Sequence, residues 1–404
     1  MTQELTAVKV TDRVYWVGAI DWDIRNFHGY LTSRGTTYNA FLVLAEKVTL
    51  IDAVKSPFFD ELMARISSVI DPSKIDYIVS NHSEMDHSGC LPEVAAAVKP
   101  ERIFASQHGL KALQEHFHGN LEVEGVQDGQ VLDLGDDKLS FFETRMCHWP
   151  DSMVSHLHGP GILFSQDAFG MHLASAERFD DELEAWPLEH ELAKYYANIL
   201  MPLSAPIKKA LAKLTDSGLD FKLVCPDHGP IWRSNFARVL ELYQRWAGST
   251  RTRKAVVVYD TMWQSTRKMA EAICDGLSSS GVKAVVMPLD SAHRSDVATE
   301  ILEAGALLVG SPTINNQMFP TVASVLCYLR GLKPAGLIGA VFGSYGWSGE
   351  STRLLSAELD AMKVEQVAEP VRVKYVPTAE DMKSCRELGT TVAERLAQAY
   401  PDKA

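Results

Sequence analysis

The chain has 404 residues, of which 46% are apolar and 23% are charged, and its formal net charge is −13. This length suggests two or three domains with sizeable cores, and the composition is that of an ordinary soluble protein. The negative charge argues against nucleic acid as a general partner. No uncharged apolar run approaches 18 residues, and no basic region followed by an apolar core opens the chain. We therefore expect no membrane span, no secretory signal and a cytoplasmic location.

The six cysteines are scattered and form no C-x-x-C pair: Cys90, Cys147, Cys225, Cys274, Cys327 and Cys385. This distribution argues against a disulfide framework, a zinc ribbon or a rubredoxin-type four-cysteine iron site in this chain. Any iron–sulfur electron donor is expected to be another protein.

Residues 1 to about 250 alternate strand-like and helix-like segments. Apolar residues three and four apart predict an amphipathic helix over 58–70. A second helix is expected over 91–98, and residues 130–134 and 139–144 are typical of a hairpin. Strands are predicted at 14–18, 38–44, 48–52, 75–80 and 102–105.

The strand predicted at 75–80 runs directly into four potential metal ligands within six residues: His82, Glu84, Asp86 and His87. A loop at the carboxyl end of a strand is where α/β folds place their chemistry. The alternative is a polar loop with two solvated histidines. Alternating His, Glu and Asp residues have no use in packing, so the pattern favours a dinuclear metal centre.

Three further single ligands each follow a strand-like run: His148, Asp167 and His228. The runs before the last two cover residues 161–165 and 221–225. Taken alone, a single histidine or aspartate at a strand end is usually a cap or turn residue.

The small, polar and basic segment 248–254 is typical of a linker and domain boundary. A β-branched run at 255–260 then predicts a central parallel strand. A hydroxyl-rich turn and a helix follow, and a helix N-terminus with hydroxyls and backbone amides can bind a phosphate. The turn matches neither a nucleotide P-loop nor a dinucleotide fingerprint; it comprises Thr261, Met262, Trp263, Gln264, Ser265 and Thr266.

Two later apolar strands, at 306–310 and 337–342, end in polar loops. In a doubly wound sheet, loops of this kind gather at the carboxyl edge near the switch point. The alternative is that these are ordinary connecting loops between strands and helices. The candidate binding residues are Ser311, Pro312, Thr313, Asn315 and Asn316 in the first loop, and Ser344, Tyr345, Gly346, Trp347 and Gly349 in the second.

The ligand pattern of the first half resembles the metallo-β-lactamase superfamily, with Glu84 in place of the usual second histidine. The turn at 261–266 is similar to the FMN phosphate loop of flavodoxins, although Trp263 replaces their usual Thr or Asn. Together the two halves resemble the flavodiiron proteins over nearly the entire chain, in the short form without appended domains. Further matching segments are 27–29, 35–39, 148–153, 195–198 and 346–350.

This resemblance implies an α/β fold with two domains. Residues 1–250 would form a metallo-β-lactamase-like αββα sandwich that binds two non-haem iron ions. Residues 254–404 would form a flavodoxin-like doubly wound parallel sheet that binds FMN. A carboxylate at position 84 adds a hard anionic ligand, which favours iron.

The resemblance also assigns roles to residues. One iron would bind His82, Glu84 and His148, the other Asp86, His87 and His228, and Asp167 would bridge the two. The assignment of His87 as a ligand stays open, because the equivalent histidine turns away from the metal in some family members. His28 and Tyr196 would line the pocket at the open coordination positions, or else belong to a satisfied polar network.

The implied activity is reduction of O2 to water, of NO to N2O, or of both, with electrons from a rubredoxin-type donor passing through FMN. The family also forms head-to-tail dimers, alone or as dimers of dimers. Two alternatives remain open: a metal-dependent hydrolase of the metallo-β-lactamase type, and a non-catalytic electron carrier or gas sensor.

Overall fold

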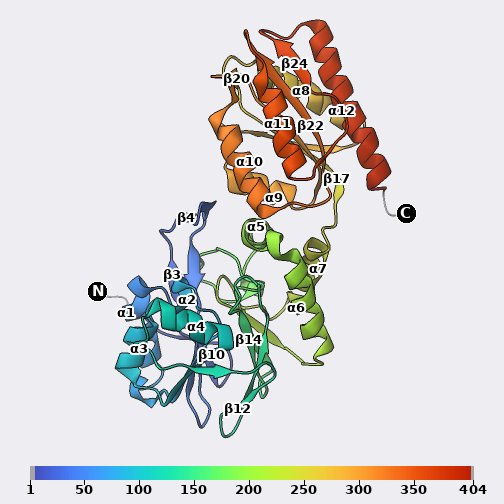
Figure 1. The fold of residues 1–404 in the computed structure, drawn as a ribbon. Coiled ribbons are helices and arrows are strands. Elements are labelled where there is room, and N and C mark those ends of the chain that lie inside the picture. The colour runs from blue at the N-terminus through green and yellow to red at the C-terminus, as the bar shows by residue number, and fades with distance from the viewer. Residues whose placement is uncertain (1–4, 402–404) are drawn as a thin grey trace. The chain divides into compact units, whose positions relative to one another are not determined.

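The computed structural model describes residues 5–401, which divide into two compact units. The first unit holds residues 5–28, 32–195 and 205–244, and the second holds residues 29–31, 196–204 and 245–401. Figure 1 labels the elements of both. The domain limits predicted at 250 and 254 stay a prediction; strand β17 (Thr252–Tyr259) already begins within the proposed linker.

Two sheets form the centre of the first unit. The seven-stranded sheet has the order β1 (Val8–Lys9), β2 (Val14–Trp16), β7 (Phe41–Val43), β8 (Thr49–Ile51), β9 (Tyr77–Ser80), β10 (Arg102–Ser106) and β11 (Glu124–Val126). In this sheet the neighbouring strands from β8 through β11 pair in parallel, and the neighbouring strands from β1 through β8 pair antiparallel. The five-stranded sheet has the order β12 (Val131–Asp133), β13 (Lys138–Glu143), β14 (Met153–Leu157), β15 (Ile162–Gln166) and β16 (Leu223–Pro226). The predicted hairpin is confirmed as the antiparallel pair β12–β13.

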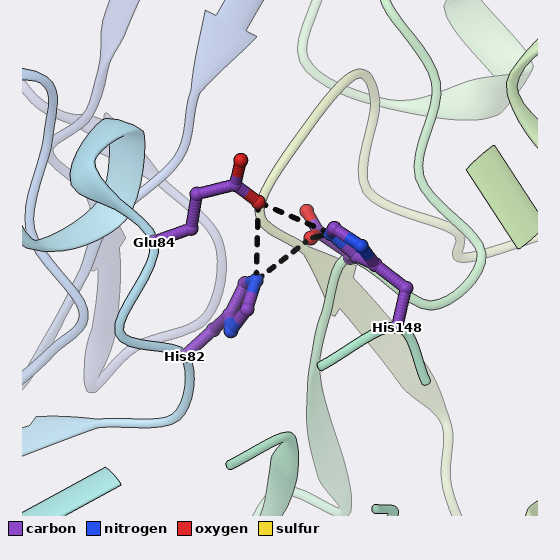
Figure 2. Close-up of side chains that lie close together, drawn as sticks. His82, Glu84 and His148 are labelled. Carbon is purple, nitrogen blue, oxygen red and sulfur yellow. Dashed lines mark hydrogen bonds and ion pairs between the residues drawn. The ribbon is translucent and has the colours of Figure 1, made fainter. Parts of the chain in front are cut away.

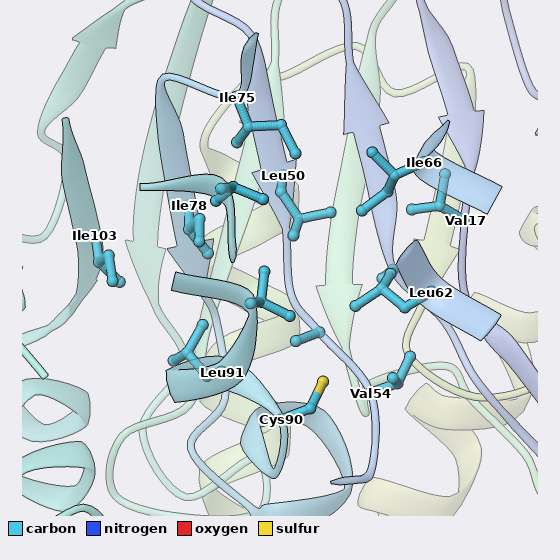
Figure 3. Packing of buried hydrophobic residues seen from close by; sticks show 14 of the residues in the cluster. Val17, Leu50, Val54, Leu62, Ile66, Ile75, Ile78, Cys90, Leu91 and Ile103 are labelled. Atoms are coloured by element: carbon cyan, nitrogen blue, oxygen red, sulfur yellow. The ribbon is translucent and has the colours of Figure 1, made fainter. Parts of the chain in front are cut away.

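Helices cover the outer faces of both sheets. Leu62 and Ile66 of α1 (Phe59–Ser67) and Leu91 of α3 (Leu91–Val98) belong to one buried cluster with Leu50 and Ile78 of the first sheet (Figure 3). Helix α4 (Gln107–His116) contributes to the same cluster, and α6 (Ser204–Asp216) and α7 (Phe236–Ala247) lie on the second sheet. Between the sheets, the rings of Phe41 and Phe164 lie 5.3 Å apart. The predicted αββα sandwich is confirmed.

The strand predicted over 38–44 is in fact two strands. Residues Thr36–Tyr38 form β6, which pairs with β3 (Ala19–Asp21), whereas β7 pairs with β2. The chain changes partner at Asn39 and Ala40. Gly18 permits this close approach, because a Cβ there would lie 2.2 Å from the carbonyl oxygen of Tyr38. The short strands β4 (Asn26–Phe27) and β5 (Tyr30–Leu31) and helix α5 (Ala185–Tyr195) also lie before residue 196.

The second unit is a six-stranded parallel sheet, which confirms the predicted doubly wound fold. Its order is β18 (Lys283–Pro288), β17, β19 (Ala304–Gly310) and β22 (Ile338–Tyr345), and β22 also pairs with β23 (Glu365–Gln366) and β24 (Val371–Lys374). Helices α8 (Ser265–Ser279) and α12 (Ala379–Ala399) cover one face. Helices α9 (Arg294–Ile301), α10 (Pro320–Leu332) and α11 (Glu350–Ala361) pack on the other (Figure 1). Within residues 5–401, no helix combines the length and apolarity that crossing a membrane requires.

His156 on β14 makes the first unit sensitive to acid. Its ring is buried, and burial together with the charge of His158 lowers its pKa, partly offset by Asp220 and Asp137. Because the unfolded histidine binds a proton more readily, stability should fall as the pH drops below about 6.5. We expect a loss of at most about 1 kcal/mol between pH 7 and pH 5.5. Urea unfolding of the wild type and of His156→Gln at both pH values measures this loss of stability. An equal loss in the two proteins between pH 7 and pH 5.5 would contradict the prediction.

Candidate metal centre and cofactor cavity

The seven predicted metal ligands all lie in segments that follow strands of the two sheets. His82 and Glu84 follow β9, and the next turn is not a loop but the short helix α2 (Met85–Ser88), which carries Asp86 and His87. His148 lies between β13 and β14. Asp167 follows β15 directly, and His228 follows β16. The fold therefore brings together residues that are up to 146 positions apart (82 to 228) in the chain.

The first ligand group consists of His82, Glu84, His148 and Asp167. Figure 2 shows the three labelled side chains pointing at one another. Nε2 of His148 lies 3.1 Å from Oε2 of Glu84 and 2.9 Å from Oδ2 of Asp167. Nε2 of His82 lies 3.4 Å and 3.3 Å from the same two oxygens. Four ligand atoms thus face one small space, as a metal ion requires.

The second group consists of Asp86, His87 and His228. Nε2 of His87 lies 3.2 Å from Oδ1 of Asp167, and Nε2 of His228 lies 3.5 Å from that oxygen. Asp86 faces both rings, at 3.4 Å from His87 and 3.2 Å from His228. The two oxygens of Asp167 therefore each face a different group. This is the geometry of a bridging carboxylate. The His87 ring points toward the centre, because its Nε2 faces both Asp86 and Asp167.

The buried polar atoms of the centre fit two metal ions. His82 Nε2, His87 Nε2, both Asp86 oxygens and Asp167 Oδ1 are buried without a hydrogen-bond partner among the described residues. Unpaired buried polar atoms are costly, and metal coordination removes that cost. Burial alone would raise the pKa of the Asp167 carboxyl, but the positive charge of His87 and the hydrogen bond from His148 hold it well below its usual value. Three carboxylates in this space attract cations strongly.

Hydrogen bonds to the outer ring nitrogens fix the histidines. Nδ1 of His82 lies 3.0 Å from Oδ2 of Asp151, which also accepts bonds of 2.7 Å from the amide and hydroxyl of Ser83. Nδ1 of His228 lies 2.6 Å from the carbonyl oxygen of Thr37. Such partners orient metal-binding histidines and raise their basicity. The sequence analysis missed these partners.

Of the two predicted pocket residues, the structure brings His28 to the centre. Its Nε2 lies 3.1 Å from Oε1 of Glu84. Tyr196 is fully buried in the second unit, and its hydroxyl lies 3.1 Å from Oγ of Ser204; its role stays a prediction. Its neighbour Tyr195 was missed, because two adjacent tyrosines at a helix end give no sign of which one faces inward.

Tyr195 lies in the first unit beside the ligands. Its ring centroid is 5.1 Å from that of His172 and 6.1 Å from that of His228. Burial, followed by the charges of Asp167, Asp86 and Glu84, raises the pKa of its hydroxyl well above the usual value. The tyrosine therefore stays protonated and can donate a hydrogen bond.

The second unit contains a cavity of about 760 Å³ at the carboxyl edge of its sheet, within the size range of cofactor sites. Eleven of the predicted binding residues line it: Met262, Trp263, Ser265, Pro312, Thr313, Asn315, Asn316, Ser344, Tyr345, Gly346 and Trp347. The sequence analysis missed Ile314, Ser348, Tyr375 and Val376, which also line it. Hydroxyls at the start of α8 and aromatic rings at the rim fit the phosphate and ring of FMN.

Five predicted binding residues are not in the lining of this cavity. Thr261 and Gln264 line a neighbouring cavity of about 500 Å³. Thr266 is buried with its hydroxyl 2.9 Å from that of Ser344, and Ser311 is buried with its hydroxyl donating a hydrogen bond of 2.8 Å to the carbonyl of Pro312. Gly349 precedes helix α11. These residues support the loops, and direct contacts from them to a cofactor stay a prediction.

Comparison with known proteins identifies relatives over both units. A model of the ODP family beta lactamase matches residues 36–229, and a flavodoxin model matches residues 257–389. The chain is 44% identical over 394 residues to a nitric oxide reductase of Moorella thermoacetica, covering 96% of this chain and 99% of that one. It is also 44% identical over 398 residues to a rubredoxin-oxygen oxidoreductase of Megalodesulfovibrio gigas, covering 97% and 98%.

Solved structures agree with these relatives. The rubredoxin oxygen:oxidoreductase from Desulfovibrio gigas superposes with a TM-score of 0.95 at 44% identity, covering 98% of this chain and 99% of that one. The flavodiiron protein from Giardia intestinalis superposes with a TM-score of 0.94 at 32% identity, covering 99% and 98%.

Asp151 provides a direct test of the metal centre. Asp151→Ala removes the acceptor of the His82 ring, so we expect metal affinity to fall by about 10- to 100-fold. Asp151→Asn retains an acceptor and should lose less. Metal titration monitored by absorbance measures both variants. Asp180→Asn is the matched control. Asp180 is also buried, and among the described residues its carboxylate accepts hydrogen bonds from Arg233, Ser234 and Asn235, away from the metal ligands. An Asp151→Ala affinity equal to that of the control would refute the role.

Proposed function

Because the chain belongs to the flavodiiron protein family, we propose that it is an oxidoreductase that reduces O2 to water, NO to N2O, or both. The observation that carries this proposal is the shared carboxylate of Asp167, which faces two ligand groups in a chain that also contains a flavodoxin-like unit. Reduction of O2 to two waters takes four electrons and four protons, and coupling of two NO molecules takes two of each. Two iron ions and one FMN would together hold four electrons.

We assign one iron to His82, Glu84 and His148 and the other to Asp86, His87 and His228, with Asp167 as the bridge. Glu84 is the residue that favours iron over zinc at the first position, since a carboxylate is a harder ligand than an imidazole. The direction of the His87 ring supports its inclusion, because Nε2 faces both Asp167 and Asp86.

Around the irons, the protein would supply protons and orientation. His28 holds its Nε2 beside Glu84, and its side chain is 73% exposed, so it can exchange protons with solvent. Tyr195 is buried with its ring centroid 6.1 Å from that of His228, and its hydroxyl stays protonated, so it is a candidate proton donor on the buried side. Tyr196 remains a second candidate for this role.

FMN would bind in the cavity of the second unit, with its phosphate near Ser265 at the start of α8 and its ring near Tyr345 and Trp347. Bound FMN would pair single electrons arriving from a donor. Five predicted binding residues do not line this cavity, and we place them in supporting positions around it: Thr261, Gln264, Thr266, Ser311 and Gly349.

We propose a rubredoxin-type protein as the donor and a head-to-tail dimer, or dimer of dimers, as the assembly. The relatives named rubredoxin-oxygen oxidoreductase and flavorubredoxin support the donor. At the rim of the cavity, Trp263 and Trp347 are 87% and 90% exposed, and large exposed aromatic residues mark contact surfaces. The six free cysteines support a reducing compartment such as the cytoplasm.

Steady-state gas consumption tests the proposal. Purified protein is first analysed for iron, zinc and FMN, then reduced anaerobically through a rubredoxin and exposed to O2 or NO at gas electrodes. Sustained consumption of at least one gas is expected. Zinc or an absence of FMN would refute the proposal. Ester or lactam turnover without a reductant would indicate a hydrolase, and a single turnover without steady consumption would indicate a carrier or sensor.

Glu84 should matter for the reaction itself. Glu84→Gln retains the size of the side chain but removes its charge and one anionic ligand, so we expect gas consumption to fall at least tenfold. The exposed Glu93 on α3, changed to Gln, is the matched control. Unchanged consumption by Glu84→Gln with full iron occupancy would contradict the ligand assignment.

A further inference from the structure

Asn39 is a fully buried residue that connects the strand pair β3–β6 to the loop carrying His228. Its side-chain Nδ2 donates hydrogen bonds of 2.7 Å to the carbonyl of Pro226 and 2.9 Å to that of Gly229. Its backbone amide donates a third bond, of 2.7 Å, to the carbonyl of Asp227. One residue therefore holds the main chain on both sides of His228.

The orientation of the Asn39 amide is fixed by Trp16. The indole Nε1–H of Trp16 lies 2.8 Å from Oδ1 of Asn39. An indole N–H can only donate, so it must face the amide oxygen, and the amide NH2 must then face the two carbonyls. A flipped amide would lose all three side-chain bonds.

Two arginine side chains hold the Trp16 ring in place. The guanidinium groups of Arg65 and Arg178 lie 4.8 Å and 4.6 Å from its ring centroid. Cations over an indole ring are attracted by its π electrons. The indole is also almost fully buried. Trp16 therefore presents its N–H in a fixed direction.

From these contacts we infer that Asn39 is a positioning residue for His228 and so for one of the two metal positions. With Thr37, which binds the outer nitrogen of His228 and the amide of Gly229, it directs Nε2 of His228 toward Asp86 and Asp167. The inference rests on the proposed assignment of His228 as an iron ligand.

The other metal position does not depend on this contact. His82 is oriented by Asp151, and Asn39 makes no hydrogen bond to His82, Glu84 or His148 among the described residues. Loss of the Asn39 contacts should therefore loosen one iron and leave the other in place. A residue needed only for general stability would affect both.

Asn39→Asp is the decisive variant, because it keeps the shape but replaces the NH2 donor by an oxygen that faces two carbonyl oxygens. Iron release to a chelator from the reduced protein should become biphasic, with one iron leaving at least tenfold faster than in the wild type. After the fast phase, electron paramagnetic resonance of the oxidised protein should show an isolated ferric ion in place of a coupled pair.

Two further variants keep the test decisive. Trp16→Phe removes the indole donor but leaves the Asn39 donors, so it should show the same biphasic release with a smaller acceleration. Ser140→Ala removes a partly buried hydrogen bond to His158, away from the ligands, and should release iron as the wild type does. If Asn39→Asp does not fold, Trp16→Phe decides the matter alone.

Release of both irons together, or at the wild-type rate, would overturn the inference. That outcome differs from failure of the proposed function, in which the wild-type protein itself would not hold two irons.

Discussion

The carboxylate of Asp167 is the group on which both halves of the metal centre depend. Its Oδ2 faces His82 and His148, and its Oδ1 faces His87 and His228. A single buried carboxylate can serve two positions only if ligands from both sheets of the sandwich meet around it. The strand ends of β9, β15 and β16 place them there.

The two metal positions are supported in different ways. A side-chain carboxylate, Asp151, binds the outer nitrogen of His82, whereas a backbone carbonyl, that of Thr37, binds the outer nitrogen of His228. An ionised partner makes an imidazole a stronger donor than a neutral one does. His82 and His228 would therefore differ in strength as ligands, even though each iron has two histidines and one carboxylate of its own.

The sequence predicted the architecture and the ligand cluster at 82–87 from local signals. His148, Asp167 and His228 were expected from the family resemblance, and the binding of metal by all seven residues stays a prediction. Four ligands within six residues identify the loop after β9, and β-branched runs identify the parallel strands of the second unit. The outer partners could not be predicted in this way. Asp151, Thr37 and Asn39 act through hydrogen bonds to residues far along the chain, and no spacing in the sequence marks such contacts. Similarly, the break between β6 and β7 depends on the close approach of Gly18 to Tyr38, which is a tertiary contact.

Mössbauer spectroscopy of the wild-type protein loaded with ⁵⁷Fe tests the central claim, a pair of irons bridged by Asp167, most directly. The account predicts two irons per chain whose ferric forms are magnetically coupled into a diamagnetic pair, and loss of this coupling in Asp167→Asn with His82 and His228 unchanged. Two uncoupled ferric ions, or a single iron per chain in fully loaded wild-type protein, would contradict it.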